Sequence, residues 1–142
     1  MAKKVFVSGV YDLLHSGHIY FFETCAKFGD LYVGVGSDES VTGYKRPPVN
    51  NENVRLYMIK SVKFVKDAVI LRSAEPIFNF KEFVENLKPD IFVVNDDSSY
   101  LPEKEEYCKN LGIEFKLLKR EAKDELPELS TTAIIKKVKN NY

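Results

Sequence analysis

The chain has only two histidines, His15 and His18, and they lie three residues apart between an apolar run at 5–7 and a helix-like segment from about residue 19. A helix start presents unpaired main-chain N–H groups and the positive end of the helix dipole, so it favours an anion. Gly17 removes a side chain where a phosphate would approach the main chain. Two imidazoles can donate to phosphate oxygens and stabilise charge that develops during substitution at phosphorus. The pattern indicates a phosphate site with catalytic histidines; two exposed histidines beside a helix cap are the ordinary alternative.

The elements that must position these histidines alternate between short apolar runs and amphipathic segments. Alternation of this kind predicts a parallel sheet covered by helices on both faces, with ligands bound outside the carboxyl ends of the strands. We expect strands at 5–7, 31–35, 68–71, 91–94 and 113–118, and helices at 19–28, 50–62, 80–87, 102–111 and from 130 or 131 to 138. Residues 38–46 are expected to be irregular, and 119–128 to form a polar loop over the ligand edge. We expect one domain over residues 1–142.

Composition excludes several classes of function. Lysine plus arginine and aspartate plus glutamate both number 21, so no net positive charge indicates a nucleic-acid partner. No apolar run approaches the roughly 20 residues that span a bilayer. Cys25 and Cys108 lie far apart, each in a helix-like segment, which argues against a disulfide framework or a zinc site. We expect a cytoplasmic protein that binds neither membrane nor nucleic acid, and no protein-held metal.

The region around the histidines also resembles a known signature. Residues 9–18 are similar to the G-x-F-D-x-x-H-x-G-H pattern of the cytidylyltransferase-type nucleotidyltransferases, with tyrosine at position 11. The serine and threonines at 130–132 resemble the second hallmark of that superfamily, a Ser/Thr-rich helix start near the C-terminus. Residues 35–39, 46–49, Arg55 and 95–97 resemble further family elements, so the likeness extends over nearly the whole chain. It implies a Rossmann-like three-layer α/β/α fold with a five-stranded parallel sheet, of the HUP nucleotidyltransferase type.

The resemblance also implies an activity. A phosphorylated acceptor would attack the α-phosphate of CTP or ATP in line, with release of pyrophosphate and no covalent enzyme intermediate. Mg²⁺ would accompany the triphosphate, held mainly by phosphate oxygens and water. The expected acceptor is a small phosphorylated alcohol or sugar phosphate, and the family commonly forms homodimers.

Site residues follow from the resemblance, position by position. His15 and His18 would contact the reacting phosphate as the catalytic pair. Lys45 or Arg46 would close over phosphate. The nucleotide and its phosphates would be bound by Gly9, Val10, Tyr11, Gly17, Arg46, Asn95, Asp97, Arg120, Ser130, Thr131 and Thr132. The acceptor would be bound by Asp12, Asp38 and Arg55.

Two positions depart from the family pattern. Asn95 stands where the family has glycine, and Arg120 lies several residues further from the Ser/Thr helix start than in the short glycerol-phosphate enzymes.

Several functions stay open at this point. Within the family, glycerol-phosphate or ethanolamine-phosphate cytidylyltransferases, heptose-phosphate adenylyltransferases of lipopolysaccharide core biosynthesis and FAD synthetases are alternatives. A nucleotide-binding sensor without turnover is a second class, and a scaffold without a ligand is a third. Intact histidines and an intact Ser/Thr helix start favour an enzyme.

Overall fold

A single parallel sheet organises the computed structural model, which describes residues 2–43, 46–73, 75 and 77–142. Its strands are β1 (Lys4–Gly9), β2 (Asp30–Gly36), β3 (Asp67–Leu71), β4 (Ile91–Asn95) and β5 (Glu114–Leu118). They lie in the order β3-β2-β1-β4-β5, and every neighbouring pair is parallel. The five-stranded parallel sheet predicted from the sequence is confirmed.

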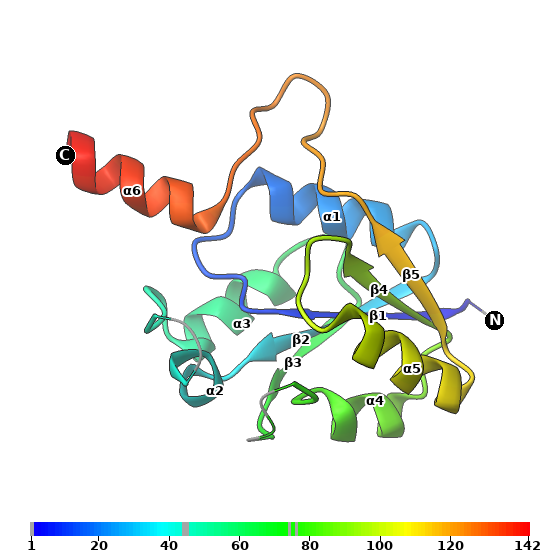
Figure 1. Cartoon of the computed structure of the whole chain (residues 1–142). Coiled ribbons are helices and arrows are strands. Elements are labelled where there is room, and N and C mark those ends of the chain that lie inside the picture. The colour runs from blue at the N-terminus through cyan, green and yellow to red at the C-terminus, as the bar shows by residue number, and fades with distance from the viewer. Residues whose placement is uncertain (1, 44–45, 74, 76) are drawn as a thin grey trace.

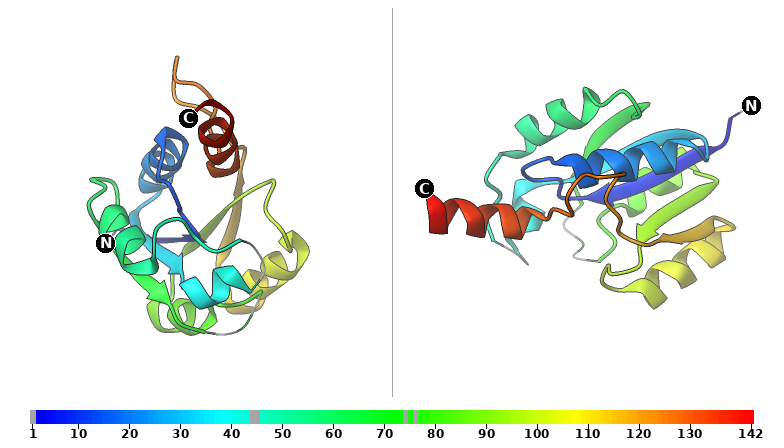
Figure 2. Two further views of the ribbon diagram at one scale, coloured as in Figure 1. Left: turned by 90° about the vertical axis from the view of Figure 1, so that its left-hand side faces the viewer. Right: turned by 90° about the horizontal axis from the view of Figure 1, so that it is seen from above.

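Helices cover both faces of this sheet (Figures 1 and 2). They are α1 (Ser16–Ala26), α2 (Asp38–Thr42), α3 (Glu52–Lys60), α4 (Lys81–Leu87), α5 (Leu101–Leu111) and α6 (Thr131–Asn141). Phe22 of α1 and Ile59 of α3 pack on one face with Val5 and Val7. Val84 of α4 and Cys108 of α5 pack on the other with Phe6 and its neighbours. The alternation of β1 side chains between two cores confirms the three-layer Rossmann-like architecture.

Two elements differ from the sequence expectation. Residues 38–46 were expected to be irregular, but α2 occupies Asp38–Thr42 and is capped by Ser37, whose Oγ accepts from the Ser40 N–H at 3.1 Å. Five residues are too few to show helical periodicity. Helix α1 begins at Ser16 rather than near residue 19, because the His15 side chain caps it.

The sheet separates between β1 and β4. The β1–β2 ladder runs from Lys4–Asp30 to Gly9–Val35, whereas the β1–β4 ladder contains only Val5–Ile91 and Phe6–Phe92. The chain order also reverses here, since β2 and β3 lie on one side of β1, and β4 and β5 on the other. Such a switch point is where open parallel sheets bind ligands, beyond the carboxyl ends of the strands.

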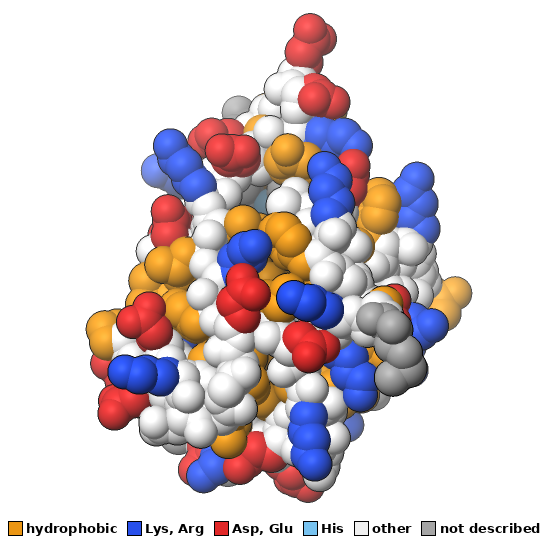
Figure 3. All heavy atoms as spheres, turned by 90° about the vertical axis from the view of Figure 1, so that its right-hand side faces the viewer, with side chains coloured by type: hydrophobic (Ala, Val, Ile, Leu, Met, Phe, Trp, Pro, Cys, Tyr) orange, Lys and Arg blue, Asp and Glu red, His pale blue; other side chains and the backbone are white. Residues whose placement is uncertain are grey.

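Outside the sheet, α6 has no buried residue and extends away from the body of the molecule (Figures 1 and 2). In the part of the chain that the structure describes, no helix is long and apolar enough to cross a membrane. The face in Figure 3 intersperses acidic and basic side chains, consistent with the zero net charge.

Candidate active site

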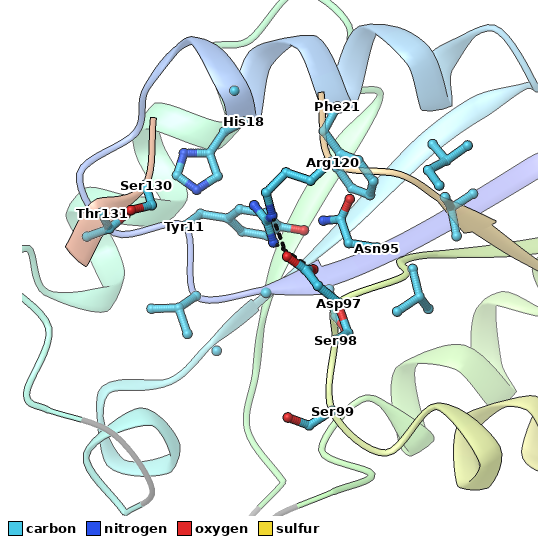
Figure 4. Close-up of a pocket in the computed structure, with 18 of the residues that line it drawn as sticks. Tyr11, His18, Phe21, Asn95, Asp97, Ser98, Ser99, Arg120, Ser130 and Thr131 are labelled. Atoms are coloured by element: carbon cyan, nitrogen blue, oxygen red, sulfur yellow. Dashed lines mark hydrogen bonds and ion pairs between the residues drawn. The ribbon is translucent and has the colours of Figure 1, made fainter. Parts of the chain in front are cut away.

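A cavity of about 1270 Å³ opens at the switch point. Its walls come from the loop after β1, the start of α1, the segment after β4, the end of β5 and the start of α6 (Figure 4). Fourteen of the sixteen residues predicted for the site line it: Gly9, Val10, Tyr11, Asp12, His15, Gly17, His18, Arg46, Asn95, Asp97, Arg120, Ser130, Thr131 and Thr132. Positions more than 100 residues apart in sequence therefore meet in one volume. Lys45, the other candidate to close over phosphate, lies outside the described residues.

Main-chain N–H groups hold the two histidine rings in one tautomer. Nδ1 of His15 accepts from the Gly17 N–H at 3.0 Å, and Nδ1 of His18 accepts from the His15 N–H at 3.1 Å. Since each Nδ1 is an acceptor, each neutral ring carries its proton on Nε2. The rings stack with centroids 3.9 Å apart, and Figure 4 shows the His18 ring pointing from α1 into the cavity. The site thus presents two neighbouring Nε2–H donors.

Burial keeps both rings neutral. It lowers the pKa of His18 to about 3, with further lowering from the positive charges of His15 and Arg120. Burial also lowers the pKa of His15, again with a contribution from Arg120. A neutral imidazole donates through Nε2–H without itself carrying a charge. The pair can therefore bind phosphate oxygens near neutral pH without taking up a proton first.

The loop that precedes the histidines has a constrained backbone. Tyr11 and Leu13 have φ angles of 55° and 51°, in the left-handed region that side chains other than glycine rarely adopt. The Tyr11 ring packs edge-on against His18 and Phe22, with centroid distances of 5.7 and 5.1 Å. Its buried hydroxyl has no hydrogen-bond partner among the described residues. Tyr11 thus lines the cavity and supports the His18 ring.

The Asp12 side chain fixes the same loop to the segment at 46–50. Its side chain is 2% exposed and accepts from the Val49 N–H at 2.6 Å, the Asn50 N–H at 3.0 Å and Arg46 Nη1 at 3.0 Å. Burial alone would raise the pKa of Asp12, but these donors outweigh it and lower the pKa below its usual value. Asp12 lines the cavity, and its carboxylate is bound to protein donors; its contact with the acceptor stays a prediction.

Arg55 and Asp38, which the resemblance assigns to the acceptor, are not among the residues that line the cavity. Arg55 is 1% exposed, and its guanidinium donates to Asp38 Oδ1 at 2.7 Å. The other donors of Arg55 bind three main-chain carbonyls, those of Val10 (2.8 Å), Gly36 (2.8 Å) and Asn50 (2.9 Å). Arg55 is therefore not a solvated helix residue. It ties together the loops that follow β1 and β2.

The start of α6 completes the other side of the site. Ser130 caps the helix, with its Oγ accepting from the Ala133 N–H at 3.1 Å. Thr131 Oγ1 donates to the main-chain carbonyl of Asp12 at 2.7 Å. This bond fixes the Ser/Thr helix start beside the histidine loop. A phosphate chain can therefore lie between the two.

Arg120 reaches this volume despite its distance in sequence from Ser130. Its Nε and Nη2 donate to Asp97 Oδ2 and Oδ1 at 2.8 and 3.2 Å, and Figure 4 shows the pair between Tyr11 and Asn95. The arginine lowers the pKa of the Asp97 carboxyl. The extra residues before Ser130 bulge outward, and Lys123 anchors them to Glu23 of α1 at 2.7 Å (Figure 1). The longer connection leaves Arg120 in place.

Comparison with known proteins agrees with this geometry. A family model described as cytidylyltransferase-like matches residues 6–137. The chain belongs to the cytidylyltransferase-like family. It is accordingly a nucleotidyltransferase, as the sequence predicted.

Curated relatives of this nucleotidyltransferase include archaeal proteins named FAD synthase. The one from Methanosarcina barkeri is 34% identical over 98% of both chains, and the one from Methanopyrus kandleri is 32% identical over 97% of this chain and 93% of its own. Among solved structures, a lipopolysaccharide core biosynthesis protein from Thermoplasma volcanium superposes with a TM-score of 0.72 and 28% identity, covering 87% of this chain and all of its own.

The cavity of the nucleotidyltransferase includes residues that sequence reasoning missed. They are Phe21 on α1, Ile77 and Asn79 before α4, and Ser98, Ser99, Tyr100 and Lys104 after β4. The position of Lys104 could have been found from the sequence. The inward face of α5 has helical spacing and contains Leu101, Lys104 and Cys108. A lysine at such a position indicates either a buried ion pair or a ligand.

Proposed function

We propose that the chain is an FMN adenylyltransferase, which transfers AMP from ATP to the phosphate of FMN and forms FAD and pyrophosphate. The archaeal relatives named FAD synthase support this choice, since they match over nearly the full length of both chains. The size of the cavity also supports it. Pockets for one drug-sized ligand occupy roughly 300 to 1,000 Å³, and about 1270 Å³ leaves room for a nucleotide and a second large substrate.

The proposed reaction is one in-line displacement. An oxygen of the FMN phosphate attacks the α-phosphorus of ATP, the bond from that phosphorus to the bridging oxygen breaks, and pyrophosphate leaves with the electron pair. His15 and His18 donate through Nε2–H to non-bridging oxygens of the α-phosphate, where negative charge grows. No side chain needs to form a covalent bond, so catalysis rests on positioning and electrostatics.

The β- and γ-phosphates are assigned to the helix start at Ser130–Thr132 and to Arg120. The helix dipole and free N–H groups of α6 favour anions there. Arg120 supplies the planar donor set that suits phosphate. Its pairing with Asp97 holds it in the cavity before a ligand arrives.

Mg²⁺ enters the proposal with the nucleotide. The described residues contain no group of three or more His, Cys, Asp or Glu side chains that could hold a metal ion. Of the three carboxylates in the cavity wall, Asp12 is committed to Arg46 and main-chain N–H groups and Asp97 to Arg120, which leaves Glu121 as a single carboxylate among the described lining residues. Phosphate oxygens and water would therefore hold the ion, as Mg²⁺ commonly is held at nucleotide sites.

One observation carries the proposed chemistry: two neutral Nε2–H donors face a cavity whose opposite wall is the helix start that Thr131 ties to the histidine loop. The test is incubation of the purified chain with Mg²⁺, ATP and FMN, followed by chromatography for FAD and assay of pyrophosphate. We expect both products in equal amounts. Nucleotide binding without pyrophosphate release on any acceptor would instead support a sensor.

A second candidate is adenylyl or cytidylyl transfer to a sugar phosphate or small phosphorylated alcohol. The likeness to the Thermoplasma volcanium lipopolysaccharide core biosynthesis protein favours it. The same assay, run with CTP and ATP against glycerol 3-phosphate and a sugar 1-phosphate, separates the two candidates. Pyrophosphate release with a sugar phosphate but not with FMN would select the second.

A further inference from the structure

The cavity extends beyond the part that the proposed phosphate chemistry uses. Its far wall is built from the segment before α4 and the segment that joins β4 to α5, and is lined by Ile77, Asn79, Ser98, Ser99, Tyr100 and Lys104. In Figure 4, Ser99 lies well away from His18, with Arg120 and Asp97 between them. The part of the acceptor substrate that extends from the attacking phosphate would face this wall.

Lys104 is the only cation that α5 contributes to this wall. Its side chain is partly buried and makes no ion pair with any residue that the structure describes. Burial lowers its pKa, against a smaller opposing effect of Glu103. A half-buried ammonium without a carboxylate partner is costly unless a ligand supplies an acceptor. The position therefore suits an uncharged or partly negative oxygen of a substrate.

Tyr100 adds an aromatic surface beside this ammonium. It lines the cavity, yet its side chain is 54% exposed, which is high for a large aromatic residue. Its backbone is left-handed, with φ of 60°, and its side chain makes no capping bond to α5. Strain of this kind at a cavity wall is typical of ligand sites. An exposed ring at this position offers a face on which a flat heteroaromatic group can stack.

We propose that Tyr100 and Lys104 form the subsite for the isoalloxazine ring of FMN, with Tyr100 stacking on the ring and Lys104 donating to its carbonyl edge. The inference rests on the proposed function, because it names the part of the acceptor that reaches this wall. Ser98 and Ser99 lie in the sequence between Asp97 and Tyr100, and they bind the ribityl hydroxyls. A sugar phosphate has neither a flat ring to stack nor a conjugated carbonyl edge.

Flavin fluorescence gives a direct test with the full chain. Riboflavin and FMN are titrated separately into the wild type, Lys104→Met, Lys104→Arg and Tyr100→Leu. Lys109→Met is the matched control, since Lys109 lies on the exposed side of α5 and does not line the cavity. We expect Lys104→Met and Tyr100→Leu to weaken the binding of both flavins ~10-fold. This is the range of one charge-assisted hydrogen bond or one stacking contact. Lys104→Arg should recover part of the loss, and Lys109→Met should match the wild type.

The riboflavin arm decides whether Lys104 binds the ring, because riboflavin has no phosphate. Riboflavin affinity unchanged in Lys104→Met overturns the subsite, whether or not FMN binding weakens. If the wild type also makes FAD, that result leaves the proposed function intact. Riboflavin binding that depends on Lys104 without FAD formation supports the subsite and overturns the proposed function. A wild type that binds neither flavin overturns both.

Discussion

The two sides of the cavity are held in different ways. On the β1 side, Asp12 and Arg55 are almost fully buried and tie the histidine loop to its neighbours through at least seven hydrogen bonds. On the β4 and β5 side, Arg120 and Asp97 are each about half exposed and bind mainly each other. The segment from 119 to 130 contains no helix or strand.

This difference separates chemistry from substrate entry. Transition-state donors lose effect when misplaced by about 1 Å, so they need a loop that cannot move. The triphosphate and the acceptor must enter and leave the cavity. The side chains that bind them can therefore be exposed, since their contacts must form and break with each turnover. We expect substitutions on the β1 side to affect stability and turnover, and those on the opposite side to affect binding.

The largest effect should come from the buried side. Arg55→Met removes the donors of four hydrogen bonds and leaves the carbonyls of Val10 and Gly36 unsatisfied. We expect a loss of ~3–5 kcal/mol in the free energy of unfolding, measured by urea denaturation. Lys60→Met is the control, because both side chains of its ion pair with Asp67 are more than half exposed and the pair should contribute less than ~1 kcal/mol. Equal losses in the two variants would contradict the comparison.

The next effect concerns turnover. His18→Ala removes one Nε2–H donor at the reacting phosphate, and we expect kcat to fall ~10²-fold or more, with a smaller change in KM for ATP. Steady-state pyrophosphate release measures both constants. Thermal melting serves as the control for folding. A rise in KM with unchanged kcat would place His18 in ground-state binding instead.

The same histidine should make stability depend on pH. Its pKa is about 3 in the folded chain against 6.5 as the ordinary value, so the unfolded chain binds the proton first as the pH falls. Stability is therefore lost as the pH drops below about 6.5, by roughly 2 kcal/mol between pH 6.5 and pH 5. Urea denaturation across this range measures the slope. The slope should be shallower in His18→Gln, and an identical slope in both proteins would show that the ring is accessible in the folded chain.

The smallest effect on stability should appear on the exposed side. Arg120→Met breaks the pair with Asp97 but changes the free energy of unfolding by less than ~1 kcal/mol, because exposed ion pairs contribute little. We expect KM for ATP to rise ~10-fold, as for a lost phosphate contact. Pyrophosphate release against ATP concentration measures it. A loss of stability as large as that of Arg55→Met would mean that both walls are structural.

The fold could be predicted because its signals are local. Apolar strands, helical periodicity and the residues at 9–18 and 130–132 predicted the sheet and most of the cavity. The structural contacts of Asp12, Asp38 and Arg55 join distant segments and could not be predicted. Arg55 meets Val10 and Gly36 only after three loops fold together, so one sequence cannot distinguish a buried brace from a phosphate ligand. Lys104 was detectable as a lysine on the inward face of a helix.

The short β1–β4 ladder has a consequence for recognition of the nucleoside. Past Phe6 and Phe92 the two strands no longer pair, while Ser8, Gly9 and Val93–Asn95 still line the cavity. β1 and β4 are not hydrogen-bonded to each other there. Main-chain N–H and C=O groups that the β1–β4 ladder does not use border the opening. A base inserted into this seam would be recognised by the polypeptide backbone, as an additional strand is. Substitution of side chains around this opening would then leave the preference between adenine and cytosine unchanged. A change of that preference would require a different spacing between β1 and β4.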